Sequence, residues 1–259
     1  MLAPLTVERP SGAPIARPAI ACLFLLAGCA APARIGDPSG SVPSPGPDSA
    51  LVVLEVRLRR SAEMVDGRGA LRVFDQDVSV EYRAGGRGAG LDAGEVALEG
   101  RPLRRALDGK RGVSYRLGRD EPEGGAKAGG EPWATIASTG GPDVPPASVR
   151  VKLAPYPLVT RPTPGQGVMR SEELPIVMLP PVADVWYRVS LTGAGDPVNA
   201  TDLGEGRWLF PQGSLTGLDP GRARLLIEVE TSCGDCPGVG SLRANWSTRT
   251  ELELAITLL

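Results

Sequence analysis

The sequence predicts an all-β protein of two antiparallel β-sandwich domains that follow a leader and a flexible tether. Three observations lead to this fold class. From Leu51 onward, short runs alternate apolar and polar residues with a period of two, as strands with one buried face do. Turn-forming residues separate these runs, and no segment keeps the 3.6-residue period of an amphipathic helix. Before Leu51, the composition is that of a short apolar segment and a proline-rich coil.

Residues 1–28 are expected to be a signal peptide. An apolar run from Ala19 to Gly28 follows the positive charge of Arg17, and small residues lie at its end. A charged start, a short apolar core and small residues at the cut are the pattern of a secretory signal. Ten residues would rise only about 15 Å as a helix, half of the hydrocarbon thickness of a bilayer, so a transmembrane helix is not expected.

The segment Leu26-Ala27-Gly28-Cys29 resembles a lipobox, the signal-peptidase site of bacterial lipoproteins. The resemblance implies cleavage between Gly28 and Cys29, and acylation of Cys29 with fatty acids such as palmitate. A lipid anchor would then tie the N-terminus to a membrane of the cell envelope. In such lipoproteins of diderm bacteria, the absence of Asp after the cysteine favours the outer membrane, and Ala30 stands there.

Residues 29–50 are expected to be the lipidated cysteine and a disordered tether. Pro32, Pro38, Pro43, Pro45 and Pro47 lie here among Gly, Ser and Ala. A coil of about twenty residues spans roughly 25 Å, and a polyproline-like one up to about 60 Å. The tether would therefore hold the folded part clear of the lipid head groups.

Residues 51–154 are predicted to form the first sandwich domain. Its alternating runs are Val52/Leu54/Val56/Leu58, Leu71/Val73, Val78/Val80/Tyr82, Val96/Leu98, Val113/Tyr115/Leu117 and Val149/Val151/Leu153. Between them, Asp75-Gln76-Asp77 is expected to be a turn, with two carboxylates as weak candidates for calcium. A short helical turn is predicted near Leu103–Leu107, and 121–130 is predicted to be a loop.

Residues 155–259 are predicted to form the second domain, of about the size of an immunoglobulin-like sandwich. Prolines 155, 157, 162 and 164 mark a connector between the two domains or an edge segment, because proline removes ladder donors and fixes φ. The alternating runs that follow are Val185/Tyr187/Val189/Leu191, Leu225/Ile227/Val229, Leu242/Ala244/Trp246 and Leu252/Leu254/Ile256/Leu258.

Two segments resemble sandwich domains of uncharacterised bacterial lipoproteins. One is Asp202-Leu203-Gly204-Glu205-Gly206 with the stretch from Leu215 to Gly221, and the other is Gly90-Leu91-Asp92-Ala93-Gly94-Glu95-Val96. The resemblance implies an immunoglobulin-like or fibronectin-III-like fold and carries no activity or site residue.

The composition excludes several classes of function. The chain contains no histidine, so Ser-His-Asp and Cys-His catalysis and histidine-based zinc sites are not expected. A formal net charge of −2 and the absence of a large Lys/Arg cluster argue against a nucleic-acid partner. The run Gly88–Ala93 imitates a dinucleotide fingerprint, but a strand pattern follows it where a helix is required. No cofactor and no metal are therefore predicted.

Cys233 and Cys236 are predicted to form a disulfide. Cys22 leaves with the leader and Cys29 carries the lipid, so this pair remains in an exported chain. Redox chemistry of the thioredoxin type needs a helix N-terminus in a βαβ unit, whereas strand patterns flank this pair. The bond is expected across the tip of a hairpin between the runs 225–229 and 242–246.

The expected role is that of a lipid-anchored, non-enzymatic binding or structural module in the cell envelope, with a protein or glycan partner. The alternative is a hydrolase of envelope glycans, since such enzymes need only two carboxylates within roughly 5–10 Å. Glycan sites are usually lined by aromatic side chains, and the chain has four tryptophans. Most are expected in the cores, and Trp186 is the candidate for exposure because it alternates away from the apolar face.

Overall fold

The computed structural model describes residues 51–85, 88–117, 133–179, 184–237 and 242–259. In these residues the chain forms 17 strands and no helix, so the all-β prediction is confirmed there. None of the described residues forms a helix that could cross a membrane. The predicted leader, lipobox and tether lie outside the described residues, as does the predicted loop 121–130.

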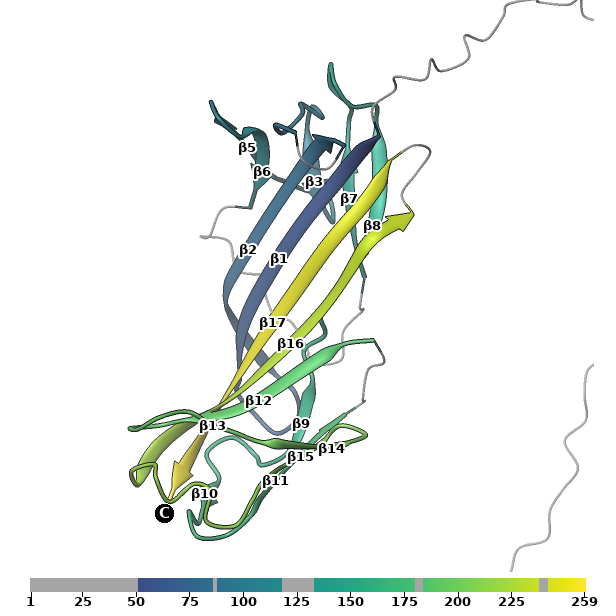
Figure 1. Ribbon diagram of the computed structural model, residues 1–259. Coiled ribbons are helices and arrows are strands. Elements are labelled where there is room, and N and C mark those ends of the chain that lie inside the picture. Colours follow the sequence, from purple (N-terminus) through teal and green to yellow (C-terminus); the bar gives the residue numbers. More distant parts are fainter. Residues whose placement is uncertain (1–50, 86–87, 118–132, 180–183, 238–241) are drawn as a thin grey trace, which may run out of the picture. The chain divides into compact units, whose positions relative to one another are not determined.

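The largest sheet has nine strands in the order β13-β12-β16-β17-β1-β2-β6-β5, with β10 paired to β17. Figure 1 shows β2, β1, β17 and β16 as four long neighbouring strands. The strands of this sheet are β1 (Val52–Met64), β2 (Leu71–Ala84), β5 (Arg104–Asp108), β6 (Gly112–Arg116), β10 (Gly167–Val168), β12 (Trp186–Thr192), β13 (Val198–Asn199), β16 (Gly221–Pro237) and β17 (Arg243–Leu258).

Period-two alternation gives the long strands one buried face. Along β17 every second residue is buried, from Ala244 to Leu258, and the residues between them reach solvent in part. Strand β1 lies parallel to β17 and antiparallel to β2, with Val56 opposite both Trp246 and Val80. The sheet therefore has an inner, apolar face and an outer, polar face.

Two four-stranded sheets pack on the inner face (Figure 1). The first has the order β4-β3-β7-β8 and the second β14-β15-β11-β9. Their strands are β3 (Val96–Leu98), β4 (Arg101–Pro102), β7 (Trp133–Ser138), β8 (Ala147–Lys152), β9 (Leu158–Arg161), β11 (Leu174–Leu179), β14 (Thr201–Gly204) and β15 (Arg207–Phe210). Each small sheet and the long sheet enclose a separate hydrophobic core.

The two cores do not follow the predicted division at residue 154. The first core contains Leu54 of β1 but also Trp246 of β17, from the segment predicted to form the second domain. The second core contains Ile227 and Leu254 but also Met64 of β1. This happens because β1 and β17 pair over most of their length and run through both cores. The described residues belong to one compact unit.

The predicted connector is a buried crossing between the two small sheets. Residues 154–157 are buried where the chain passes from β8 to β9. The amide N–H of Ala154 donates to Oγ1 of Thr248 (2.7 Å), and the Ala154 carbonyl accepts from Oγ1 of Thr250 (2.6 Å) and from Arg60. The Arg60 guanidinium also lies over the ring of Tyr156, 4.6 Å from its centroid. Polar side chains on the inner face thus satisfy the backbone that crosses between the cores.

Two local predictions are wrong. Residues 103–107 do not form a helical turn, because Arg104–Asp108 is the edge strand β5, paired with β6. The apolar residues Leu103 and Leu107 fit a helical spacing, but the chain uses them in a hairpin. Asp75-Gln76-Asp77 is not a turn either and lies inside β2, where Phe74 is the extra residue of a bulge opposite β1.

Candidate functional site

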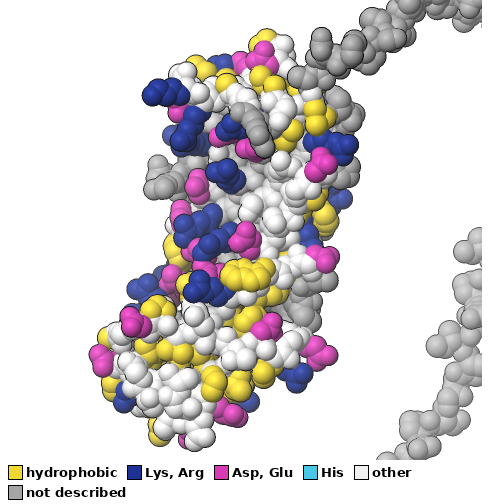
Figure 2. Space-filling view, in the orientation of Figure 1, with side chains coloured by type: hydrophobic (Ala, Val, Ile, Leu, Met, Phe, Trp, Pro, Cys, Tyr) yellow, Lys and Arg dark blue, Asp and Glu magenta, His cyan; other side chains and the backbone are white. Residues whose placement is uncertain are grey.

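The outer face of the long sheet carries most of the charged side chains of the four long strands. These residues alternate with the core residues on β1, β2, β16 and β17. Figure 2 shows Lys/Arg and Asp/Glu side chains gathered together over the middle of this face. Cross-strand register therefore decides which charges meet.

Most of these charges are matched in ion pairs. Arg249 pairs with both Glu228 and Glu251, and Arg59 reaches the same Glu251 at 2.8 Å. The hydrogen bond to Glu251 and its negative charge raise the pKa of Arg59, so this guanidinium stays charged. Towards the next rows of the sheet, Arg83 pairs with Glu55 at 3.3 Å.

One cross-strand row differs from its neighbours, because its arginines lie beside serines. Arg57 on β1 faces Ser247 of β17 on one side and Ser79 of β2 on the other. Ser79 in turn faces Arg116 of β6. No described residue forms an ion pair or a side-chain hydrogen bond with Arg57, with Arg116, or with Arg111 of the β5–β6 hairpin. Within the described part of the chain, the donors of these three guanidinium groups have no acceptor and can bind a ligand.

The row opens into a hollow of about 440 Å³, which we call the Arg57 hollow. Its arginines are Arg57, Arg59, Arg111, Arg116 and Arg249, and its acidic residues are Asp77 and Glu81. A second hollow of about 390 Å³ adjoins it, since Arg57 and Ser247 line both. The second hollow is lined by the polar Ser232 and Asn245, by Gly234, by the acidic Glu55, and by the apolar Val56, Cys233 and Trp246, so it combines polar and apolar groups. Together the two hollows offer cationic donors beside neutral hydrogen-bonding groups.

The disulfide borders the second hollow. Cys233 and Cys236 are bonded, with their Cα atoms 5.9 Å apart, within the range that a disulfide allows. They lie in a bulge of β16, since Cys233 faces Trp246 and Cys236 faces Ala244. The pairing is as predicted, but its place is not: the expected tip of the hairpin falls in 238–241, outside the described residues.

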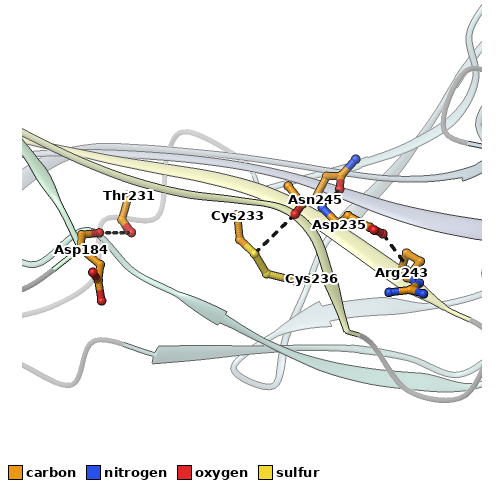
Figure 3. The surroundings of a disulfide bond; sticks show 8 residues. Asp184, Thr231, Cys233, Asp235, Cys236, Arg243 and Asn245 are labelled. Atoms are coloured by element: carbon orange, nitrogen blue, oxygen red, sulfur yellow. Dashed lines mark hydrogen bonds and ion pairs between the residues drawn. A yellow bond between two sulfur atoms is a disulfide. The ribbon is translucent and has the colours of Figure 1, made fainter.

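Figure 3 shows the contacts around this bulge, which join Asp235 to Asn245 and Arg243. Asp235 has a φ of 59°, in the left-handed region that few residues other than glycine adopt. Its N–H donates to Oδ1 of Asn245 (2.7 Å), and its carboxylate lies 3.7 Å from Nε of Arg243. The disulfide and these two contacts fix the rim of the second hollow from both strands.

The tryptophans divide between core and surface. Trp208 and Trp246 are buried, as expected, and Trp186 is 56% exposed at the start of β12, beyond the part of the strand that pairs with β13. Trp133 is exposed as well, at 42%, with the guanidinium of Arg150 5.3 Å from its ring centroid. Trp186 faces Glu230, which faces Arg249, so it lies in a cross-strand row that reaches the Arg57 hollow.

A second polar cluster joins the loop 91–95 to β6. Asp92 accepts hydrogen bonds from the N–H of Gly94 (3.0 Å) and the hydroxyl of Tyr115 (3.2 Å), and it pairs with Arg105 at 2.6 Å. The Gly94 hydrogen bond, with those of Tyr115 and Arg105, lowers the pKa of Asp92. Burial raises the pKa of Tyr115, whose oxygen also accepts the N–H of Ala93. The cluster fixes the loop 91–95. Neither Asp92 nor Tyr115 lines one of the two hollows described above.

The other predicted site residues fall outside this surface. Gly28 and Cys29 lie outside the described residues. Among the described residues, no three His, Cys, Asp or Glu side chains come together as a metal site, and Asp75 and Asp77 form none. Sequence reasoning missed Arg57, Arg111 and Arg116. Their types were visible, but only the register of β1, β2, β6 and β17 shows that serines surround them.

Comparisons with known proteins give no family. No protein-family model matches the chain, and no curated protein matches it. Among solved structures, a crystal structure of the FN1-FN3 domains of chicken CNTN1 is similar at 15% identity, with a TM-score of 0.19. The match covers 73% of this chain and 68% of that one. At this TM-score the likeness does not indicate a shared fold.

Proposed function

We propose that the protein is a lipid-anchored module of the cell envelope that binds a partner through the outer face of its long sheet. The observation that carries the binding role is the Arg57 row, where arginines without a partner among the described residues lie beside serines on a sheet that matches most of its other charges. The lipobox-like segment before Cys29 supports the anchor, and the proline-rich residues 29–50 support a tether. We place the mature protein in the outer membrane by the same resemblance.

The anchor is tested with Cys29→Ser. Loss of the acylated thiol removes the strong apolar anchor expected in the mature chain, so the variant should leave the membrane fraction. The measurement is membrane fractionation after a high-salt wash, with metabolic labelling by an alkyne fatty acid. Cys22→Ser is the matched control and should stay membrane-bound and labelled. A Cys29→Ser protein that remains in the washed membranes would refute the anchor.

The binding face is tested by photo-crosslinking in cells. A crosslinker at Ser79 or Ser232, on the outer face, should capture a partner in the envelope. The control position is Glu172, which is exposed in the loop before β11. Capture from position 172 alone would place the binding surface elsewhere on the molecule.

The hydrolase alternative has no specific observation in its favour. Three acidic residues line the two hollows: Glu55 and Glu81 both pair with Arg83, and only Asp77 has no ion pair among the described residues. A glycosidase instead needs two carboxylates that face each other across a bound sugar.

A further inference from the structure

We infer that the Arg57 hollow binds a phosphate group carried by a sugar, as in a phosphorylated envelope glycan. This inference rests on the proposed function and names the ligand class of the same face. The charge of the hollow, the spacing of its arginine and serine donors, and the lining of the adjoining hollow all support it.

The charge balance favours an anion. Five arginines line the hollow against two acidic residues. Arg59 and Arg249 are held by glutamates on β16 and β17, but Arg57, Arg111 and Arg116 have no carboxylate partner among the described residues. Like charges gathered in one hollow repel one another, and a bound counter-charge relieves that repulsion. An anionic ligand would supply that charge.

The spacing of the arginine and serine side chains favours a ligand group that accepts hydrogen bonds from several directions. Arg57 and Arg116 lie on β1 and β6, with Ser79 of β2 between them in the same row. Two strand spacings are about 9.5 Å, so the two flexible side chains can converge on one group above Ser79. A guanidinium is a planar fork of donors that suits phosphate in two-point contact. The hydroxyls of Ser79 and Ser247 can serve the remaining oxygens.

A phosphate ester fits this donor set better than a carboxylate does. A phosphate monoester presents three terminal oxygens and nearly two negative charges, enough for two guanidinium forks and a hydroxyl. A carboxylate presents two oxygens and one charge. In the neighbouring row, two arginines, Arg59 and Arg249, are enough to pair with the carboxylate of Glu251.

The adjoining hollow identifies what carries the phosphate. It shares Arg57 and Ser247 with the first, and its other polar groups include Ser232, Asn245 and the backbone of Gly234. These groups can bind sugar hydroxyls, and the apolar Val56 and Trp246 that also line the hollow can contact the ring of a sugar. The volumes of about 440 and 390 Å³ are in the range of small-molecule sites.

The experiment measures the binding of glucose 1-phosphate to the purified full chain in detergent by NMR titration. Wild type should bind it, and the double variant Arg57→Gln/Arg116→Gln should bind at least ten-fold more weakly. Arg207→Gln is the matched control, since Arg207 is an exposed arginine on β15 that pairs with the exposed Glu205. Its affinity should equal that of wild type. Arg57→Lys keeps the charge without the fork and should give an intermediate Kd.

Two further arms fix the ligand class. Glucose alone should not bind measurably, and phosphatidylcholine vesicles with 20% phosphatidic acid should not bind more protein than plain phosphatidylcholine vesicles do. Equal affinities of the double variant and wild type would overturn the inference, as would equal binding of glucose. Binding only to the phosphatidic acid vesicles would overturn it in favour of a lipid ligand.

The failure of this inference is distinct from that of the proposed function. A protein that leaves membranes on Cys29→Ser and crosslinks from Ser79, but binds glucose 1-phosphate no better than its double variant, keeps the proposed function and loses the phosphate. Circular dichroism of each arginine variant checks that the fold is retained, as we expect because Arg57, Arg116 and Arg207 are exposed.

Discussion

At the scale of single residues, polar side chains on the inner face of the long sheet differ in role from those on its outer face. Thr248 and Thr250 are completely buried on the inner face, yet both bind the backbone of the crossing segment. Arg57 and Arg116 point outward and have no protein partner among the described residues. Sequence alone could not separate these tasks, since each residue is one polar position in an alternating run.

We expect Thr250→Val to destabilise the protein by about 1–2 kcal/mol. Valine keeps the shape of threonine but removes the donor that serves the buried Ala154 carbonyl, and a weakened buried hydrogen bond costs about that much. Urea unfolding should show a lower midpoint with an unchanged slope. Thr257→Val, on the exposed side of β17, is the control and should change stability by less than about 0.5 kcal/mol.

We expect Asp92→Asn to destabilise the protein at pH 7 and to lose this effect in acid. The folded-state pKa of Asp92 is lowered, so its ionised form stabilises the fold above the unfolded-state pKa of about 3.9. That contribution is lost as the pH falls through the folded-state value. Urea unfolding of both proteins from pH 7 down to pH 2 should show converging midpoints. Asp196→Asn, in an exposed loop, is the control, and a gap for Asp92→Asn that is independent of pH would contradict the argument.

At the scale of elements, the sequence predicted where strands occur but not which strands pair with each other. Alternation identified β1, β12, β16 and β17, because a half-buried strand imposes that period locally. The parallel pairing of β1 with β17 joins segments 190 residues apart, and nothing in a local pattern specifies it. The Arg57 row depends on that pairing, so it was not predictable. The bulge at Cys233–Cys236 was hidden for the same reason, since a bulge is defined by the partner strand.

The double variant Cys233→Ala/Cys236→Ala should stay folded and lose about 2 kcal/mol or less. Closing so short a loop removes little entropy from the unfolded chain. The bond itself is checked by thiol labelling of the protein unfolded without reductant, in which neither cysteine should react. Two reactive thiols would mean that the pair is reduced, and the redox interpretation would then return.

At the scale of the whole molecule, the two cores depend on the same strands. β1 and β17 give residues to both cores, and a small sheet covers each core from the inner side. The length of the chain and its proline-rich segment 155–164 suggested tandem domains. A linker between domains and a segment that crosses between two sheets of one domain can have the same composition. What distinguishes them is burial, and residues 154–157 are buried.

We expect residues 51–259 to fold on their own into a strand-rich protein, and residues 51–154 alone to stay unfolded. The shorter fragment lacks Leu242, Ala244 and Trp246, which belong to its core, and it leaves one edge of β1 unpaired. Far-ultraviolet circular dichroism and the dispersion of amide NMR signals test both. A well-dispersed spectrum for 51–154 would restore the tandem-domain arrangement.

The pairing of β1 with β17 also sets the order of events during biogenesis. A chain that emerges from its N-terminus delivers β17 after every other described strand, and that strand completes both cores. Closing a loop of this length costs entropy before any contact offsets it, so maturation should be slow and late. Until then the free edge of β1 can recruit strands from other chains. A product truncated before residue 242 would therefore expose two half-built interiors at once, and we expect the cell to treat it as damaged.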